Sequence, residues 1–155
     1  MNEINRNNII FELNKINKHC CGCTACVFKC YNNAIYMKID EKGFYNVSIN
    51  NLKCVNCGIC ISVCPIVNKK ENNSKNPEKY AFSAPKEIID KSSSGGVFTV
   101  LAQHVLNNSG VVVGAAYTNK FEVEHIIIDS INELYKLRMS KYVQSNQHDC
   151  YKKVK

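Results

Sequence analysis

The residues best suited to chemistry are the cysteines, because eight of the ten fall on one spacing that occurs twice. Each run has three cysteines separated by two residues and a fourth cysteine after three more. The first run is Cys20, Cys23, Cys26 and Cys30, and the second is Cys54, Cys57, Cys60 and Cys64. This doubled spacing is typical of chains that bind two cubane iron–sulfur clusters.

The spacing has a physical basis in the shape of a cubane. Gaps of two residues let the chain curl, so that three thiolates reach three corners of one cube. The fourth thiolate lies about one helical turn further on and reaches the neighbouring cube. We therefore assign one [4Fe-4S] cluster to Cys20, Cys23, Cys26 and Cys64, and the other to Cys54, Cys57, Cys60 and Cys30.

A zinc site and a disulfide framework are the alternatives to clusters. Zinc sites use two pairs of cysteines, or pairs with histidines, and have no use for a third cysteine in the loop. Disulfide frameworks occur in secreted chains, whereas residues 1–19 show no apolar run of the signal-peptide kind. The doubled spacing therefore favours iron–sulfur clusters.

Three other residues near the array are not needed as ligands. Cys21 lies inside the first loop, and we expect a packed thiol or a thiol at the solvent edge. His19 precedes the first ligand, and we expect it to be exposed or to support the ligands. Tyr31 stands where the second run has Pro65, a residue that ends a helix and fixes a turn. We expect this difference to loosen the first turn without removing a ligand.

Composition limits the classes of function. A chain of 155 residues holds one ordinary domain or two small ones, and no stretch is long and apolar enough to cross a bilayer. We expect a soluble cytoplasmic protein without membrane contact. The formal charge is +7, which two oxidised cubanes of about −2 each would lower to about +3. Because the lysines are scattered among 21 asparagines, we expect redox partner proteins or subunits and no nucleic acid.

Residues 1–67 are expected to form an α+β ferredoxin-like module that binds both clusters. Apolar residues at helical spacing predict a helix over 3–17. Residues 34–40 and 44–50 alternate apolar and polar side chains around Gly43, which predicts a β-hairpin. We expect one face of this hairpin to cover the clusters and limit the access of water. That face comprises Ile35, Met37, Ile39, Tyr45, Val47 and Ile49.

A polar linker over 68–79 precedes residues 80–155, which are expected to form the first part of an α/β domain. Residues 80–83 predict a short strand or an extended entry, and the apolar run 111–117 predicts a strand buried on both faces. The remaining elements are predicted as a helix from Val97 to about 107, a strand over 123–128, a helix from the capping box of Ser130 and Glu133 to Met139, and a helix over 148–155.

Two polar stretches could hold an anion or a flavin. Residues 92–96 (SSSGG) place small side chains at the start of a helix, where backbone N–H groups bind phosphate, although a serine cap with a glycine turn fits equally well. Lys141, Tyr142 and Gln144 suit a flavin's phosphate and ring, and equally suit a surface loop. We assign no catalytic residue, and Cys150 stands apart from both runs.

Three segments together resemble the coenzyme F420 hydrogenase/dehydrogenase beta-subunit family: SGGVFT (94–99), VVVGAA (111–116) and LRMSKYVQS (137–145). The cysteine array resembles the ferredoxin module of many of its members. The resemblance implies an iron–sulfur flavoprotein that passes electrons between clusters and FAD, which in the best-known members exchanges a hydride with coenzyme F420. It also implies a flavin pocket formed with the help of Ser94, Gly95, Gly96, Lys141, Tyr142 and Gln144. Family members continue beyond the position of Lys155, so we expect an incomplete flavin site.

Two functions stay open at this point. The first is an electron-transfer component of an oxidoreductase that connects two [4Fe-4S] clusters with an FAD site. The second is a ferredoxin-like carrier that docks on a partner subunit and does no flavin chemistry. Binding of FAD separates the two, and zinc in place of iron would favour a zinc or nucleic-acid module.

Overall fold

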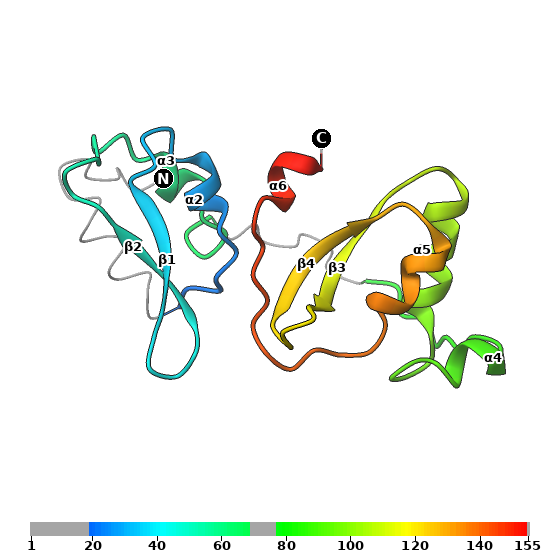
Figure 1. Ribbon diagram of the computed structural model, residues 1–155. Helices are drawn as coiled ribbons and strands as arrows, with labels where there is room; N and C mark the ends of the chain where they lie inside the picture. Colours follow the sequence, from blue (N-terminus) through cyan, green and yellow to red (C-terminus); the bar gives the residue numbers. More distant parts are fainter. Residues whose placement is uncertain (1–18, 69–76, 155) are drawn as a thin grey trace. The chain divides into compact units, whose positions relative to one another are not determined.

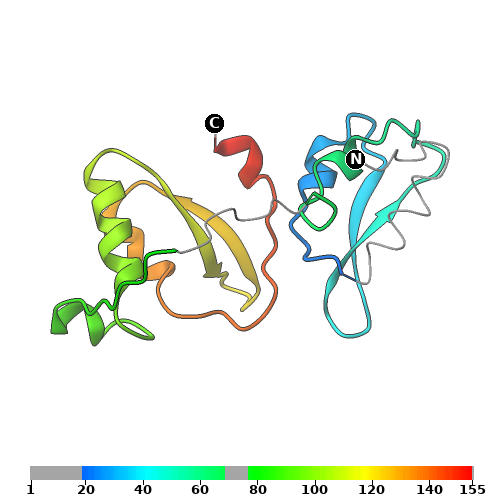
Figure 2. The same ribbon diagram turned by 180° about the vertical axis from the view of Figure 1, so that it is seen from behind.

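The computed structural model describes residues 19–68 and 77–154, so the helix predicted over 3–17 and most of the linker lie outside the described residues. The chain divides into two compact units, the first mainly within residues up to 72 and the second mainly within 73–150. Figures 1 and 2 show them from opposite sides. No helix in the two described ranges is long and apolar enough to cross a membrane.

The first unit contains the predicted β-hairpin (Figure 1). Strands β1 (Ile35–Ile39) and β2 (Tyr45–Ile49) pair antiparallel. In the turn between them Gly43 has a φ of +85°, a conformation that glycine adopts without steric cost, and its N–H donates to the Asp40 carbonyl at 3.0 Å. The predicted apolar face is confirmed by three facing pairs, Ile35 with Ile49, Met37 with Val47 and Ile39 with Tyr45.

The two cysteine runs have the same backbone course. Each loop leads into a short helix, α2 (Ala25–Lys29) after the first and α3 (Ile59–Ser62) after the second. The residues on both sides of each run's second cysteine have positive φ. The values are 66° and 59° for Gly22 and Thr24, and 54° and 78° for Asn56 and Gly58. These left-handed residues bend each run back on itself, which gives the curled loop that the cysteine spacing predicts.

The core of the first unit is small. Ile35 and Val47 of the hairpin pack with Cys60 and Ile61 of α3. The partly buried residues packed against them are Cys26, Val27, Cys30, Met37 and Ile49. A core of this size supplies little stability by apolar burial alone. We therefore expect metal ligation to supply much of the stability of this unit.

In the second unit, helix α5 (Val97–Asn107) packs beside the hairpin of β3 (Val112–Tyr117) and β4 (Val123–Ile128), as Figure 2 shows. The chain then forms a 3₁₀ helix, η2 (Ile131–Lys136). The buried core draws on all four elements and the residue after η2. It comprises Ala102, Leu106, Ala116, Ile128, Leu134 and Leu137.

Two predictions for the second unit are wrong. Strands β3 and β4 pair antiparallel, so the described residues form an α+β unit, whereas the sequence predicted the first part of an α/β domain. Strand β3 is also not buried on both faces, because Val113 and Tyr117 are exposed at 38% and 56%. A continuous apolar run is typical of parallel strands covered on both faces, whereas here α5 and η2 cover one face alone.

The segment after β4 also differs from the prediction. The expected α-helix from 130 to 139 is the shorter 3₁₀ helix η2, and its capping box is incomplete. The Ser130 hydroxyl accepts from the Asn132 N–H at 3.3 Å, while the Glu133 carboxylate pairs with Lys136 and does not reach back to Ser130.

Three further segments of the chain are short. The helix expected over 148–155 is one turn, α6 (Cys150–Lys153). Residues 80–83 are extended without forming a strand, and the one-turn helix α4 (Lys86–Ile89) was not predicted.

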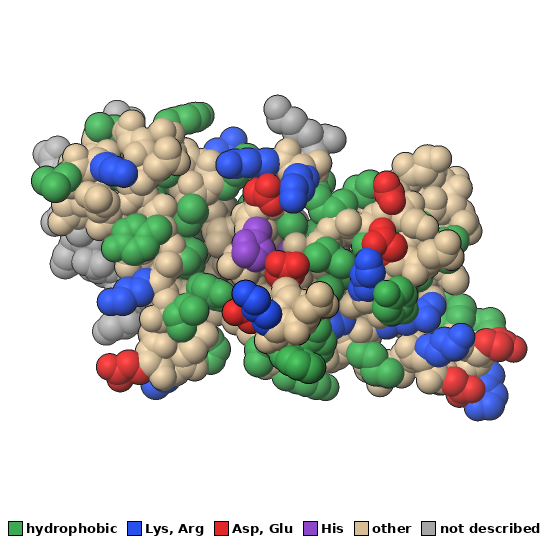
Figure 3. All heavy atoms as spheres, in the orientation of Figure 1, with side chains coloured by type: hydrophobic (Ala, Val, Ile, Leu, Met, Phe, Trp, Pro, Cys, Tyr) green, Lys and Arg blue, Asp and Glu red, His purple; other side chains and the backbone are tan. Residues whose placement is uncertain are grey.

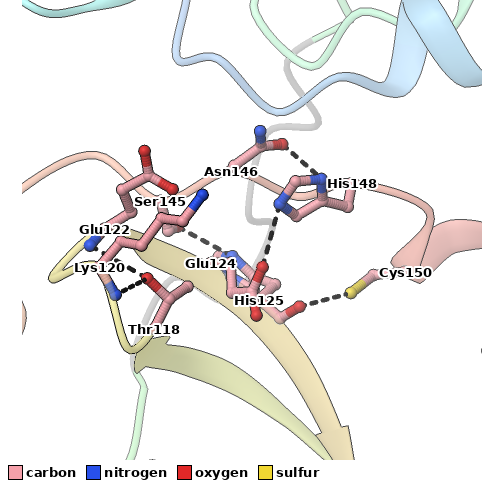
Figure 4. A network of polar contacts seen from close by, with 9 residues as sticks. All are labelled: Thr118, Lys120, Glu122, Glu124, His125, Ser145, Asn146, His148 and Cys150. Atoms are coloured by element: carbon pink, nitrogen blue, oxygen red, sulfur yellow. Dashed lines mark hydrogen bonds and ion pairs between the residues drawn. The ribbon is translucent and has the colours of Figure 1, made fainter.

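After η2 the chain returns along the free edge of β4 (Figure 4). Asn146 forms a parallel bridge with Glu124, and its carbonyl accepts from the His125 N–H at 2.8 Å. The His125 ring meets the Ser145 hydroxyl at 2.8 Å, and the His125 carbonyl accepts from Cys150 Sγ at 3.2 Å. Burial lowers the pKa of His125, which favours the neutral ring for these neutral partners.

The surface mixes charged and apolar side chains. On the face shown in Figure 3, lysines and arginines lie among acidic side chains, and hydrophobic side chains reach the surface in both units. One side of α5 contributes Val97, Leu101 and Val105, exposed at 49%, 61% and 39%. Positive charge therefore does not gather into one patch on this face.

Candidate functional site

One cavity of the first unit brings together cysteines from both runs. The cysteines that line it are Cys20, Cys21, Cys23, Cys26, Cys60 and Cys64. Four of these are the thiols that the sequence assigns to one cluster, and among those four Cys64 comes from the second run. A fourth ligand supplied by the other run is what crossed ligation requires.

The walls of this cavity suit an iron–sulfur cluster. Met37 and Val47 line it from the hairpin, so the apolar face lies against the thiols as expected. Thr24 lines it as well, and its buried Oγ1 has no hydrogen-bond partner in the described part of the chain. Buried hydroxyls are normally hydrogen-bonded, and the sulfur atoms of a cluster accept hydrogen bonds. The residues that line this cavity therefore fit a [4Fe-4S] cluster.

Burial opposes the ionisation of three cysteine thiols, those of Cys23, Cys26 and Cys60. Burial raises the pKa of Cys26 to about 12 and that of Cys60 to about 11, and neighbouring cysteines of the same run add to both shifts. Burial also raises the pKa of Cys23. A bound metal displaces the thiol proton and stabilises the thiolate. The array is therefore suited to binding cations through sulfur.

Backbone N–H groups reach several sulfur atoms. Hydrogen bonds from Ala25 and Val27 oppose the rise in the pKa values of Cys23 and Cys26. In the same way the Ala34 N–H donates to Cys30 Sγ at 3.3 Å. Hydrogen bonds to sulfur are one of the means by which a protein sets the potential of a cluster.

The other predicted ligand group is more open. Cys54 and Cys57 lie near Cys60, since each raises its pKa through charge repulsion, and Cys30 packs against the core that contains Cys60. Cys57 is exposed. Across residues 19–68 and 77–154, no three potential ligands converge as those of a single ion do.

A second cavity, of about 350 Å³, lies in the second unit and is lined by residues 92–99 and 137–140. It contains three of the predicted flavin residues, Ser94, Gly95 and Gly96. Its volume lies at the lower end of the range for small-molecule sites, about 300–1,000 Å³. It can accept part of a cofactor.

Packing within the protein accounts for the two glycines of this cavity. Gly96 has a φ of +79°, and a Cβ there would lie 2.9 Å from Ile88 Cγ2. A Cβ on Gly95 would lie 2.8 Å from the Phe82 carbonyl oxygen. Both glycines are needed to close the loop against its own neighbours, so they do not by themselves indicate a ligand.

Arg138 gives the cavity a positive charge. It lines the cavity, and its buried Nε has no hydrogen-bond partner among the described residues. The N-cap of α5 is Gly96, which has no side chain to cap the first N–H groups of the helix. A guanidinium beside a helix N-terminus favours an anion such as phosphate.

The other predicted flavin residues do not line this cavity. Lys141 Nζ donates to the carbonyl oxygens of Lys136, Arg138 and Met139 at 3.1, 2.5 and 3.1 Å, and burial lowers its pKa. Its ammonium group therefore caps the end of η2. Tyr142 is 92% exposed, and Gln144 is half-buried.

Sequence reasoning missed two residues of these sites. Arg138 lies inside the family-like segment 137–145, and it is the only arginine beyond Arg6, a rarity that could have drawn attention to it. Thr24 follows Cys23 where Gly58 follows Cys57. Comparing the two runs position by position could have singled out this hydroxyl.

Comparison with known proteins separates the chain into two matched regions. Residues 19–68 match the model of the 4Fe-4S dicluster domain. Residues 79–150 match the model described as coenzyme F420 hydrogenase/dehydrogenase, beta subunit N-term. Among curated proteins, the ketoisovalerate oxidoreductase subunit VorC of Methanothermobacter marburgensis is 35% identical over 54 residues, which cover 34% of this chain and 68% of that protein.

Proposed function

We propose a function from the premise that this chain belongs to the coenzyme F420 hydrogenase/dehydrogenase beta-subunit family and carries a 4Fe-4S dicluster domain. At the level of class, it is an iron–sulfur electron-transfer subunit of an oxidoreductase. Within that class, we assign it electron transfer between two [4Fe-4S] clusters and FAD, with coenzyme F420 as the hydride donor or acceptor. The observation that carries the flavin assignment is the cavity lined by Arg138, whose buried Nε has no hydrogen-bond partner among the described residues.

For the clusters we propose the two ligand groups derived from the spacing. The cavity shared by Cys20, Cys23, Cys26 and Cys64 supports the first group. The chain would then consist of a cluster module over 1–67, a linker over 68–79 and a beta-subunit domain from residue 80 onward. The cluster module then passes electrons and the second domain exchanges them with a hydride carrier.

The cavity residues would bind and orient the flavin. When bound, FAD exchanges electron pairs as hydride and single electrons with iron–sulfur centres. Arg138 and the first turn of α5 would hold its phosphate groups by charge-assisted hydrogen bonds. Leu137 and Met139, which line the same cavity, would shield the bound group from water.

A flavin titration tests this assignment. FAD is added to the anaerobically reconstituted chain, and binding is followed by the quenching of flavin fluorescence. Arg138→Gln removes a charged hydrogen bond worth about 1.5–3 kcal/mol. The dissociation constant of FAD should therefore be about 10- to 100-fold higher for this variant than for the wild-type chain. Lys120→Gln is the matched control, because it removes one positive charge from an exposed position of the same unit outside the cavity.

Two results would contradict the flavin assignment. One is no binding of FAD by the wild-type chain, and the other is equal weakening by the two variants. The placement of Lys141 and Tyr142 outside the cavity favours the second candidate, a ferredoxin-like carrier that docks on a partner subunit. Tight, stoichiometric FAD binding would exclude that carrier, and reduction of added coenzyme F420 by the loaded chain would extend the assignment to the hydride partner.

Iron analysis tests the cluster assignment separately. The reconstituted chain should hold about eight irons and eight sulfides, with the broad visible absorption of thiolate-ligated clusters. Zinc in place of iron would contradict it.

A further inference from the structure

A cysteine outside the repeated spacing lies where a cluster ligand would lie. Cys21 lines the cavity shared by Cys20, Cys23, Cys26 and Cys64. Its side chain also hydrogen-bonds with that of Cys23. The eight cysteines of the two runs already provide four ligands for each of two cubanes. The first cavity therefore contains a thiol beyond the proposed set.

The second run provides an internal comparison. Val55 occupies the position that corresponds to Cys21, and it is 65% exposed. The next residues along, Gly22 and Asn56, share a left-handed backbone with φ of 66° and 54°. Because the two loops follow the same course, the main difference at this position is chemical. The first loop has a sulfur atom there and the second loop has none.

We propose that Cys21 is an alternative ligand of the first cluster that can take the place of Cys23. The inference rests on the proposed function, which assigns Cys23 to that cluster. Cys21 and Cys23 line the same cavity and their side chains hydrogen-bond with each other, so either sulfur atom can serve one coordination position there. On binding iron, Cys21 releases its thiol proton to solvent and forms the iron–sulfur bond that Cys23 would otherwise form.

Two further features make Cys21 suited to this exchange. Its side chain is exposed, so a small movement toward the metal breaks little packing. Gly22, which separates it from Cys23, has φ +66°, and glycine permits a change of backbone angle at low cost. Cys60 also lines the cavity, but the spacing of the two runs assigns it to the other ligand group.

Alanine variants of the full chain test the proposal, since alanine supplies no oxygen ligand. The set is Cys23→Ala, Cys21→Ala, the double variant Cys21→Ala/Cys23→Ala, and Cys57→Ala. Cys57 is the counterpart of Cys23 in the second run. It serves as the control because Val55, and not a cysteine, occupies the position there that corresponds to Cys21. Each protein is reconstituted anaerobically, and iron, sulfide and visible absorption are measured per chain, with circular dichroism as a check on folding.

The proposal predicts a specific order of iron content. Wild type, Cys21→Ala and Cys23→Ala should each hold about eight irons, while Cys57→Ala and the double variant should lose about four. Equal iron in Cys23→Ala and the double variant would overturn the proposal, as would equal loss in Cys23→Ala and Cys57→Ala. Wild-type protein with well under eight irons would instead overturn the proposed function, and this inference with it.

Alkylation gives a readout that does not depend on the total iron. The loaded proteins are treated with iodoacetamide and the modified cysteines are mapped by mass spectrometry. Cys21 should react in loaded wild type, where Cys23 holds the metal, and should be protected in loaded Cys23→Ala, where Cys21 has become the ligand. Reaction of Cys21 to the same extent in both proteins would overturn the proposal.

Discussion

Thr24→Val should lower the reduction potential of one cluster and leave the other unchanged. Thr24 lines the first cavity, and its buried Oγ1 has no partner among the described residues. We expect this hydroxyl to donate to a sulfur atom of the bound cluster. Such a bond is stronger in the reduced, more negative state, so its loss makes reduction harder. Valine keeps the size and β-branching of threonine, which leaves the backbone strain at φ 59° unchanged.

The expected shift follows from the free energy of one hydrogen bond. A hydrogen bond to a charged group is worth about 1.5–3 kcal/mol, and a difference of about 1 kcal/mol between the two oxidation states corresponds to about 40 mV for one electron. The second cluster serves as an internal reference, because Gly58 stands at the corresponding position and has no hydroxyl. One of two reduction waves should therefore move by about 40 mV.

Square-wave voltammetry of the reconstituted chain under anaerobic conditions measures both potentials in one experiment. Thr24→Ser keeps the hydroxyl and should restore the wild-type potential, whereas Thr24→Val should not. Unchanged potentials in Thr24→Val would refute the assigned hydrogen bond. Equal movement of both waves, or an equal shift in Thr24→Ser, would point to a general change in the fold.

Three further predictions concern stability. Placing an alanine in the left-handed conformation costs about 1–2 kcal/mol. Gly96→Ala should destabilise the second unit by well over that amount, because its Cβ would lie 2.9 Å from Ile88 Cγ2. Gly43→Ala has nothing within 4 Å of its Cβ and should cost the conformational term alone, and urea unfolding of the two variants measures the difference. Burial lowers the pKa of His125 from its ordinary 6.5, so its contribution to stability is complete above pH 6.5 and falls as the pH drops below that value; thermal unfolding across this range should show a weaker pH dependence in His125→Gln. Removal of iron by a chelator should unfold the first unit and leave the second folded. Hydrogen exchange measures this by comparing the amides of residues 19–68 with those of residues 97–137. Equal protection of residues 19–68 in iron-loaded and iron-free protein would contradict the prediction.

The first unit was largely predictable because its signals are local. The alternation of apolar and polar side chains on both sides of Gly43 predicted the hairpin and its facing pairs. The cysteine spacing identified four thiols that the fold brings to one cavity. Both signals depend on neighbouring residues along the chain, where the periodicity of a strand and the length of a loop act directly.

The second unit was less predictable because its outcome depends on what covers each element. The apolar run of β3 suits a parallel strand and an antiparallel one alike, and the choice depends on its partner. Glu133 fits a capping box, yet its pairing with Lys136 prevails. Lys141 carries the charge expected of a phosphate ligand, but the carbonyl groups at the end of η2 bind it. The sequence does not show which of two competing polar partners a side chain will choose.

The matching left-handed positions of the two cysteine loops have a consequence for the direction of electron flow. Gly22 and Asn56 share one backbone conformation, as do Thr24 and Gly58, so the module is close to a duplicated half with internal twofold likeness. Two clusters in equivalent surroundings would have equal reduction potentials, and the module itself would then favour neither direction of electron flow. A difference between the two potentials requires side chains that differ between the two loops. Thr24 and Cys21 are two such side chains, and both line the first cavity.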